Sequence, residues 1–98
     1  MIEKVSDIKL ADVANYLRVE EWNGSDGDTL ETLLKVAKAF VKSYTGRTDE
    51  ELDEIADFVI VVLILCQDMW DNRTLYVDTT NLNFAVQTIL DLHSVNLL

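Results

Sequence analysis

The chain has 98 residues, of which 49% are hydrophobic, 18 are acidic and 8 are basic, giving a formal net charge of −10. This length suits one domain, and the apolar content supports a hydrophobic core and excludes a disordered chain. The negative charge argues against binding to nucleic-acid phosphates or to an anionic membrane surface, because both attract basic proteins.

The first third of the chain predicts a short helix and an acidic loop. Apolar residues at helical spacing predict an amphipathic helix over about residues 8–18, and they are Leu10, Val13, Ala14 and Leu17. Residues 20–28 then form an acidic loop that contains two glycines. Trp22 lies in this loop, and two interpretations stay open: it folds back as a lid, or it anchors a partner, since tryptophan is enriched at interface hot spots.

The second helix is predicted over residues 28–45. Asp28 and Glu31 have the spacing of a capping box, which predicts the start of the helix. Gly46 predicts its end, because a left-handed residue commonly follows a helix. One apolar stripe joins these ends, consisting of Leu30, Leu33, Leu34, Ala37, Val41 and Tyr44.

A third helix is predicted over residues 49–73, opened by a second capping box at Thr48 and Glu51. It contains nine consecutive apolar residues, Phe58–Cys66, which is well short of the ~20 residues that cross a bilayer. A helix that is apolar on all sides must be covered on all sides. In a domain this small we expect another subunit to cover Ile60 and Ile64, which lie in an otherwise acidic row.

A connector over residues 74–83 leads to a fourth predicted helix, residues 84–93, with Val86, Ile89, Leu90 and His93 facing inward. The chain then ends in an apolar tail from Ser94, whose large side chains are Val95, Leu97 and Leu98, and we expect this tail to dock on a partner. The sequence therefore predicts an all-α fold: a small four-helix single domain, residues 1–98, with a long apolar central helix.

The sequence contains no set of residues typical of a catalytic, cofactor or metal site. Its single histidine, His93, and its single cysteine, Cys66, are too few and too far apart for a zinc site. The acidic loop lacks the glycine and the bidentate glutamate of a calcium-binding EF-hand. We therefore expect no enzymatic activity and no cofactor.

Three stretches in this order resemble the head–tail connector, or adaptor, proteins of long-tailed bacteriophages, also described as DNA-packaging or head-completion proteins. Residues 12–19, DVANYLRV, resemble the opening helix of that family. Residues 33–47, ending in YTGR, resemble its second helix. Residues 69–73, MWDNR, resemble the end of its long apolar helix, and a short helix follows a loop in both.

The resemblance implies a structural protein of the virion, assembled in the cytoplasm of a bacterial host. Such proteins form a homo-oligomeric ring beneath the portal protein, extend the DNA channel and present a surface to the next head-completion or tail protein. DNA passes through the ring without being bound specifically. The candidate subunit-interface residues are Trp22, Ile60, Ile64, Val95, Leu97 and Leu98.

Two alternatives remain. Glu50, Glu51 and Glu54, followed by Asp68 and Asp71, resemble the magnesium site of the all-α nucleoside triphosphate pyrophosphohydrolases. One continuous helix would place Glu54 and Asp68 about 21 Å apart, too far for one ion to bridge. The second alternative is an acidic helical module that binds a basic protein.

Overall fold

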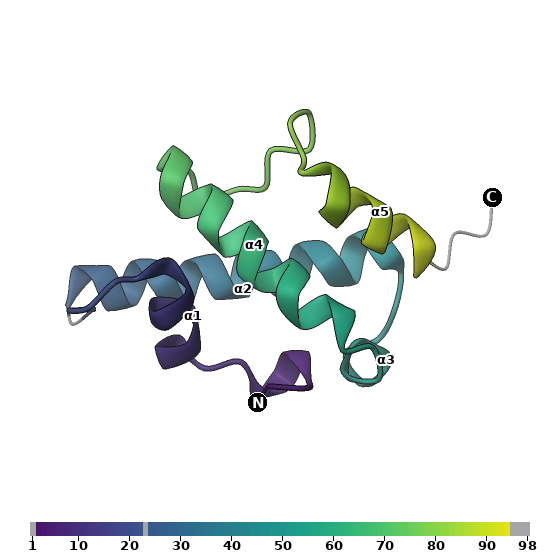
Figure 1. Ribbon diagram of the computed structural model, residues 1–98, viewed down its shortest axis with the longest axis horizontal. Coiled ribbons are helices and arrows are strands. Elements are labelled where there is room, and N and C mark those ends of the chain that lie inside the picture. The colour runs from purple at the N-terminus through teal and green to yellow at the C-terminus, as the bar shows by residue number, and fades with distance from the viewer. Residues whose placement is uncertain (1, 23, 95–98) are drawn as a thin grey trace.

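The computed structural model describes residues 2–22 and 24–94, and within them the chain is all-helical (Figure 1). A short 3₁₀ helix, Val5–Asp7, precedes α1, Leu10–Leu17, and α2, Ser25–Thr45. The remaining helices are α3, Asp49–Asp53, α4, Asp57–Asn72, and α5, Phe84–Leu92. Four of these helices have eight or more residues, so the predicted all-α, four-helix single domain is confirmed.

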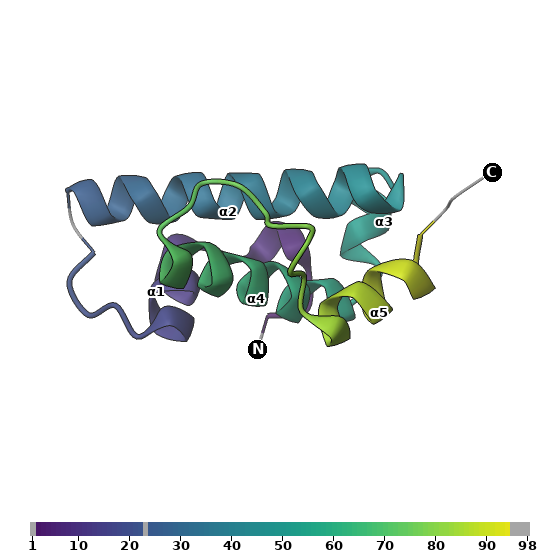
Figure 2. The same cartoon turned by 90° about the horizontal axis from the view of Figure 1, so that it is seen from above.

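The helices form two layers (Figure 2). The long α2 forms one layer, and α1, α4 and α5 lie side by side across it and each contact it. The domain measures 43 × 29 × 18 Å, and its shortest dimension is the thickness of two packed helices at 8–10 Å between their axes. The core fills the space between these layers.

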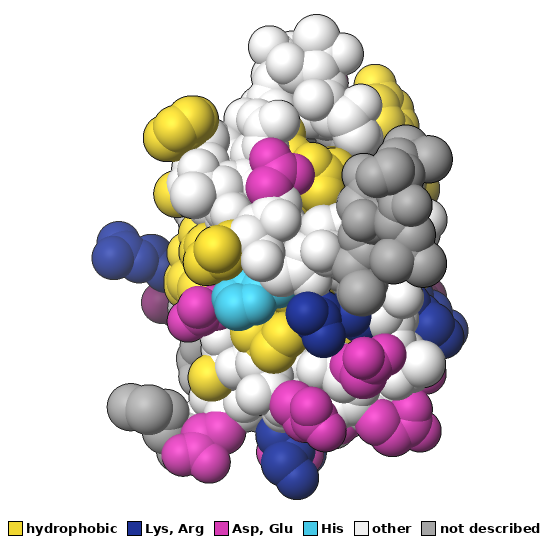
Figure 3. Space-filling view, turned by 90° about the vertical axis from the view of Figure 1, so that its right-hand side faces the viewer, with side chains coloured by type: hydrophobic (Ala, Val, Ile, Leu, Met, Phe, Trp, Pro, Cys, Tyr) yellow, Lys and Arg dark blue, Asp and Glu magenta, His cyan; other side chains and the backbone are white. Residues whose placement is uncertain are grey.

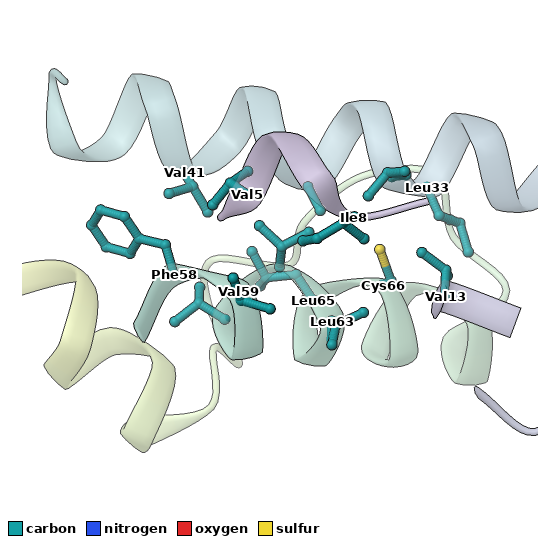
Figure 4. Close-up of a cluster of buried hydrophobic side chains, with 14 of the residues drawn as sticks. Val5, Ile8, Val13, Leu33, Val41, Phe58, Val59, Leu63, Leu65 and Cys66 are labelled. Carbon is teal, nitrogen blue, oxygen red and sulfur yellow. The ribbon is translucent and has the colours of Figure 1, made fainter. Parts of the chain in front are cut away.

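The core side chains labelled in Figure 4 come from α1, α2, α4 and the segment of the 3₁₀ turn, and Leu52 of α3 and Val86 and Leu90 of α5 belong to the same buried core. Val41 of α2, Phe58 and Cys66 of α4, and Val13 of α1 are completely buried. Val5, the first residue of the 3₁₀ turn, and Ile8, which follows the turn, are also buried in this core. The apolar stripe predicted for α2 is buried apart from Tyr44, which is half-buried.

The predicted third helix, 49–73, is wrong in one respect, because it is divided into α3 and α4. Backbone bonds three residues apart replace the α-helical pattern at the break, including Glu54 N–H to the Glu51 carbonyl and Phe58 N–H to the Ile55 carbonyl. Just before the break, the Asp53 carboxylate accepts hydrogen bonds from the backbone and hydroxyl of Ser6, at 2.9 and 2.7 Å. α3 lies out of line with α4 (Figure 1), and this contact with a distant segment lies at the break.

Two of the three helix ends that the sequence predicts from capping residues are found at the predicted positions. Thr48 and Glu51 form the predicted capping box, with Glu51 N–H donating to Thr48 Oγ1 and Thr48 N–H donating to the Glu51 carboxylate. Gly46 ends α2 in the left-handed conformation, as predicted. The predicted cap at Asp28 is wrong, because α2 begins three residues earlier, after Gly24, and Asp28 lies in its first turn.

Candidate interaction surface

The outer side of α4 carries the two isoleucines predicted to meet another subunit. Ile60 is 40% exposed and Ile64 is half-buried. Both residues lie on the side of α4 opposite to its fully buried row, which includes Val62 and Cys66. The apolar character that the sequence indicates on this outer side is therefore accessible at Ile60 and partly covered by the subunit itself at Ile64.

Trp22 lies against its own subunit. It is half-buried and packs against the hydrophobic core. Gly27, in the first turn of α2, makes room for the Trp22 backbone, because a Cβ atom on Gly27 would lie 2.5 Å from the Trp22 carbonyl oxygen. This arrangement agrees with the interpretation in which the loop folds back. The tail residues Val95, Leu97 and Leu98 lie outside the described residues.

The most exposed apolar side chain is one that sequence reasoning missed. Phe84, the first residue of α5, is 82% exposed, and Leu92, its last residue, is 75% exposed. At 100° per residue, these two share one side of α5 with Ala85 and Thr88, which are also exposed. We call these four residues the α5 outer face. The signal was present in the sequence, since apolar residues occupy both sides of this helix.

The α5 outer face contains one polar side chain, Thr88, and the exposed Asp91 borders it beside Phe84. The Thr88 hydroxyl donates to the Phe84 carbonyl oxygen at 2.9 Å, so its polar group is already satisfied within the helix. The opposite side of α5 packs inward, with Val86 and Leu90 completely buried and Ile89 half-buried, as predicted. Hydrophobic side chains therefore reach the surface at the end of the molecule that carries α5 and the last described residues (Figure 3).

Polar contacts attach the C-terminal end of α5 to α2 and α4. The Tyr44 hydroxyl donates to the Asp91 carboxylate, and this bond raises the pKa of Tyr44 above its usual value. Arg47 Nε donates to the His93 carbonyl oxygen at 2.6 Å. The half-buried imidazole of His93 packs edge-on against Phe58, with 5.4 Å between ring centroids. α5 is therefore fixed in place, so its outer face is presented at a defined position.

Two more exposed apolar side chains, Leu75 and Tyr76, belong to the connector between α4 and α5. The connector and α4 enclose a cleft of about 210 Å³. Its apolar lining consists of Leu65, Met69, Val77 and Leu82, and its polar lining of Asp68, Asn72, Thr74, Tyr76, Asp78, Asn81 and Asn83. Partial burial, with a smaller effect from the neighbouring Asp71 carboxylate, raises the pKa of Asp68.

The carboxylates of the alternative magnesium site lie on different helices. Glu50 and Glu51 are in α3, whereas Asp68 and Asp71 are near the far end of α4. Glu51 is engaged in capping α3, and these hydrogen bonds from Thr48 lower its pKa. Within residues 2–22 and 24–94, no three His, Cys, Asp or Glu side chains come together in a way that could hold a metal ion.

Over the part of the chain that the structure describes, no helix combines the length and apolar character needed to cross a membrane. No protein family, no curated protein and no solved structure matches the chain significantly.

Proposed function

We propose that the chain is a structural subunit of a bacteriophage head–tail connector ring, which joins the portal protein to the tail and extends the DNA channel. The observation that carries this proposal is the α5 outer face, where Phe84 and Leu92 are more than 70% exposed on a firmly attached helix. Apolar side chains this exposed are stabilised when another protein surface covers them.

The position of the resembling stretches supports the proposal. Each of the three stretches ends a helix with a residue in the left-handed conformation: Arg18 after α1, Gly46 after α2 and Arg73 after α4. The stretches that resemble the connector family therefore include the C-terminal ends of three helices, where the chain changes direction.

Two groups of exposed apolar residues are available for a closed ring. Ile60 lies on α4 and the α5 outer face on α5, and in this proposal they are the two contact surfaces of each subunit. In a cyclic ring every subunit contacts its two neighbours through two different surfaces. In this proposal the net charge of −10 also keeps DNA moving through the channel, because like charges repel.

Native mass spectrometry over a concentration series, with and without a portal ring, tests the proposal. We expect a closed species of about a dozen subunits, formed either by the chain alone or on the portal. Phe84→Asp should reduce assembly at least ~tenfold, because it places a charge in the buried centre of the contact.

Gln87→Asp is the matched control, since Gln87 is exposed on the same helix and borders the α5 outer face beside Phe84, on the side away from Leu92. It should assemble like the original chain. A chain that stays monomeric in both conditions contradicts the proposal, and a one-to-one complex with a basic protein instead supports the acidic binding module.

A further inference from the structure

The cleft between α4 and the connector combines an apolar lining with an uncompensated carboxylate. Leu65 and Met69 in this lining are almost completely buried, so the half-buried Val77 and Leu82 supply most of its accessible apolar surface. Two carboxylates, Asp68 and Asp78, also line the cleft, and no lysine or arginine does. The cleft therefore has a negative potential next to an apolar surface.

The two carboxylates differ in their partners. Asp78 accepts hydrogen bonds from the backbone N–H groups of Thr80 and Asn81 and from the Asn81 side chain, and these bonds lower its pKa. Among the described residues, the side-chain carboxylate of Asp68 has neither a hydrogen bond nor an ion pair, whereas its backbone belongs to α4. Partial burial without a partner is unfavourable for its ionised form. Asp68 is thus the group in the cleft that a cation would stabilise.

We propose that this cleft receives an arginine side chain from a protein partner, with the aliphatic stem against Val77 and Leu82 and the guanidinium on Asp68. Arginine and lysine stems cover apolar surface while their charged ends reach a polar group. Arginine fits better than lysine because its five N–H donors can also use the amide oxygens of Asn72 and Asn81. An inorganic cation fits less well, since the described residues hold no cluster of three candidate metal ligands.

This inference does not depend on ring assembly, because a single subunit forms the whole cleft. The test uses the ¹⁵N-labelled chain titrated with N-acetyl-arginine amide and followed by NMR. The neutral control ligand is N-acetyl-citrulline amide, which has nearly the same shape. We expect saturable shifts at the residues that line the cleft, with a dissociation constant of roughly 1 mM, and binding of citrulline at least ~tenfold weaker.

Asp68→Asn should weaken arginine binding at least ~tenfold while leaving citrulline binding unchanged. Asp71→Asn is the control, because Asp71 is exposed one turn further along α4 and does not line the cleft. It should change arginine binding less than ~threefold. The inference is wrong if the shifts scatter over the surface, if they do not saturate, if citrulline binds as well as arginine, or if Asp68→Asn binds arginine normally. None of these outcomes changes the result of the assembly test on Phe84.

Discussion

The carbonyl oxygen of Trp22 occupies the space beside Gly27 that any larger residue would need, 2.5 Å from the position of a Cβ atom. Replacing a helical glycine by alanine usually stabilises a protein, by roughly 0.5–1 kcal/mol. Here we expect Gly27→Ala to destabilise the domain by about 1–3 kcal/mol, because the backbone of the loop must move. Urea denaturation followed by circular dichroism measures the change.

Thr32→Ala is the control for this substitution, since Thr32 is exposed on the same helix. It should leave the free energy of unfolding within ~0.5 kcal/mol of the original value. Stabilisation by Gly27→Ala would mean that the loop packs elsewhere in solution. Tryptophan fluorescence of the same variant in a Trp70→Phe background reports whether the Trp22 indole has become exposed.

Arg18 and Arg73 both end helices with positive φ, at 61° and 58°. A left-handed non-glycine residue costs about 1–2 kcal/mol. We expect Arg18→Gly to stabilise the domain by about 0.5–1 kcal/mol, because part of this gain is offset by the greater freedom of glycine in the unfolded chain. The midpoint of urea denaturation should rise accordingly.

Arg73→Gly is the informative comparison. The Arg73 guanidinium lies 5.7 Å from the centre of the Trp70 ring, a contact worth about 0.5–1 kcal/mol. Losing this contact should cancel the gain, leaving stability nearly unchanged. Equal gains at both positions would mean that the contact with Trp70 contributes nothing.

Local signals in the sequence predict much of this fold, and long-range contacts explain what they miss. The capping box at Thr48 and the glycine at 46 mark their helix ends correctly, because these signals act within one turn. No glycine or proline marks the break after Asp53 in the sequence. The break coincides instead with hydrogen bonds from Ser6, 47 residues away, which local patterns do not predict. The start of α2 at Ser25 was missed because its N-cap residue, Gly24, has no side chain to make a capping hydrogen bond, whereas Asp28 and Glu31 have capping-box spacing.

The candidate surface was only partly predictable for a similar reason. Apolar spacing identifies Ile60 and the inward residues Val86 and Leu90. It does not predict which of the other apolar residues of a short helix are exposed, because their exposure depends on how many sides of the helix its neighbours cover. With α2 and α4 covering one side of α5, Phe84 and Leu92 are left on the other.

The contact between Ser6 and Asp53 predicts a dependence of stability on pH. Hydrogen bonds from Ser6 lower the pKa of Asp53 in the folded state. The stabilisation is therefore complete above the ordinary aspartate pKa of ~3.9 and is lost as the pH falls through the lower folded value. We expect Asp53→Asn to cost on the order of 1 kcal/mol at pH 7 and progressively less in acid.

Chemical denaturation at several pH values between neutral and strongly acidic checks this expectation. Glu50→Gln is the control, because Glu50 is exposed on the same short helix. Its effect should be small and should not follow the same trend. A loss of stability in Asp53→Asn that is independent of pH would assign the contact to packing rather than to charge.

Cys66 should be an unreactive thiol in the folded protein. It is completely buried in α4, and burial raises its pKa to about 12. At pH 8 the thiolate fraction is then about 10⁻⁴, and only the thiolate attacks a disulfide reagent. We expect labelling by such a reagent to be at least ~1000-fold slower in the folded state than in guanidinium chloride. Rapid labelling of the folded chain would contradict the buried position of the thiol.

The exposed position of Ile60 on the outer side of α4 leads to a prediction about assembly. Ile60 is 40% exposed, so Ile60→Asp should leave the fold intact, with a loss of less than about 1 kcal/mol. In the proposed ring the same change buries an unpaired charge between subunits and should weaken assembly at least ~tenfold. Ser43→Asp on the exposed polar side of α2 adds the same charge elsewhere and should assemble normally. Unchanged assembly of Ile60→Asp would leave the α5 outer face as the remaining candidate and would remove α4 from the interface.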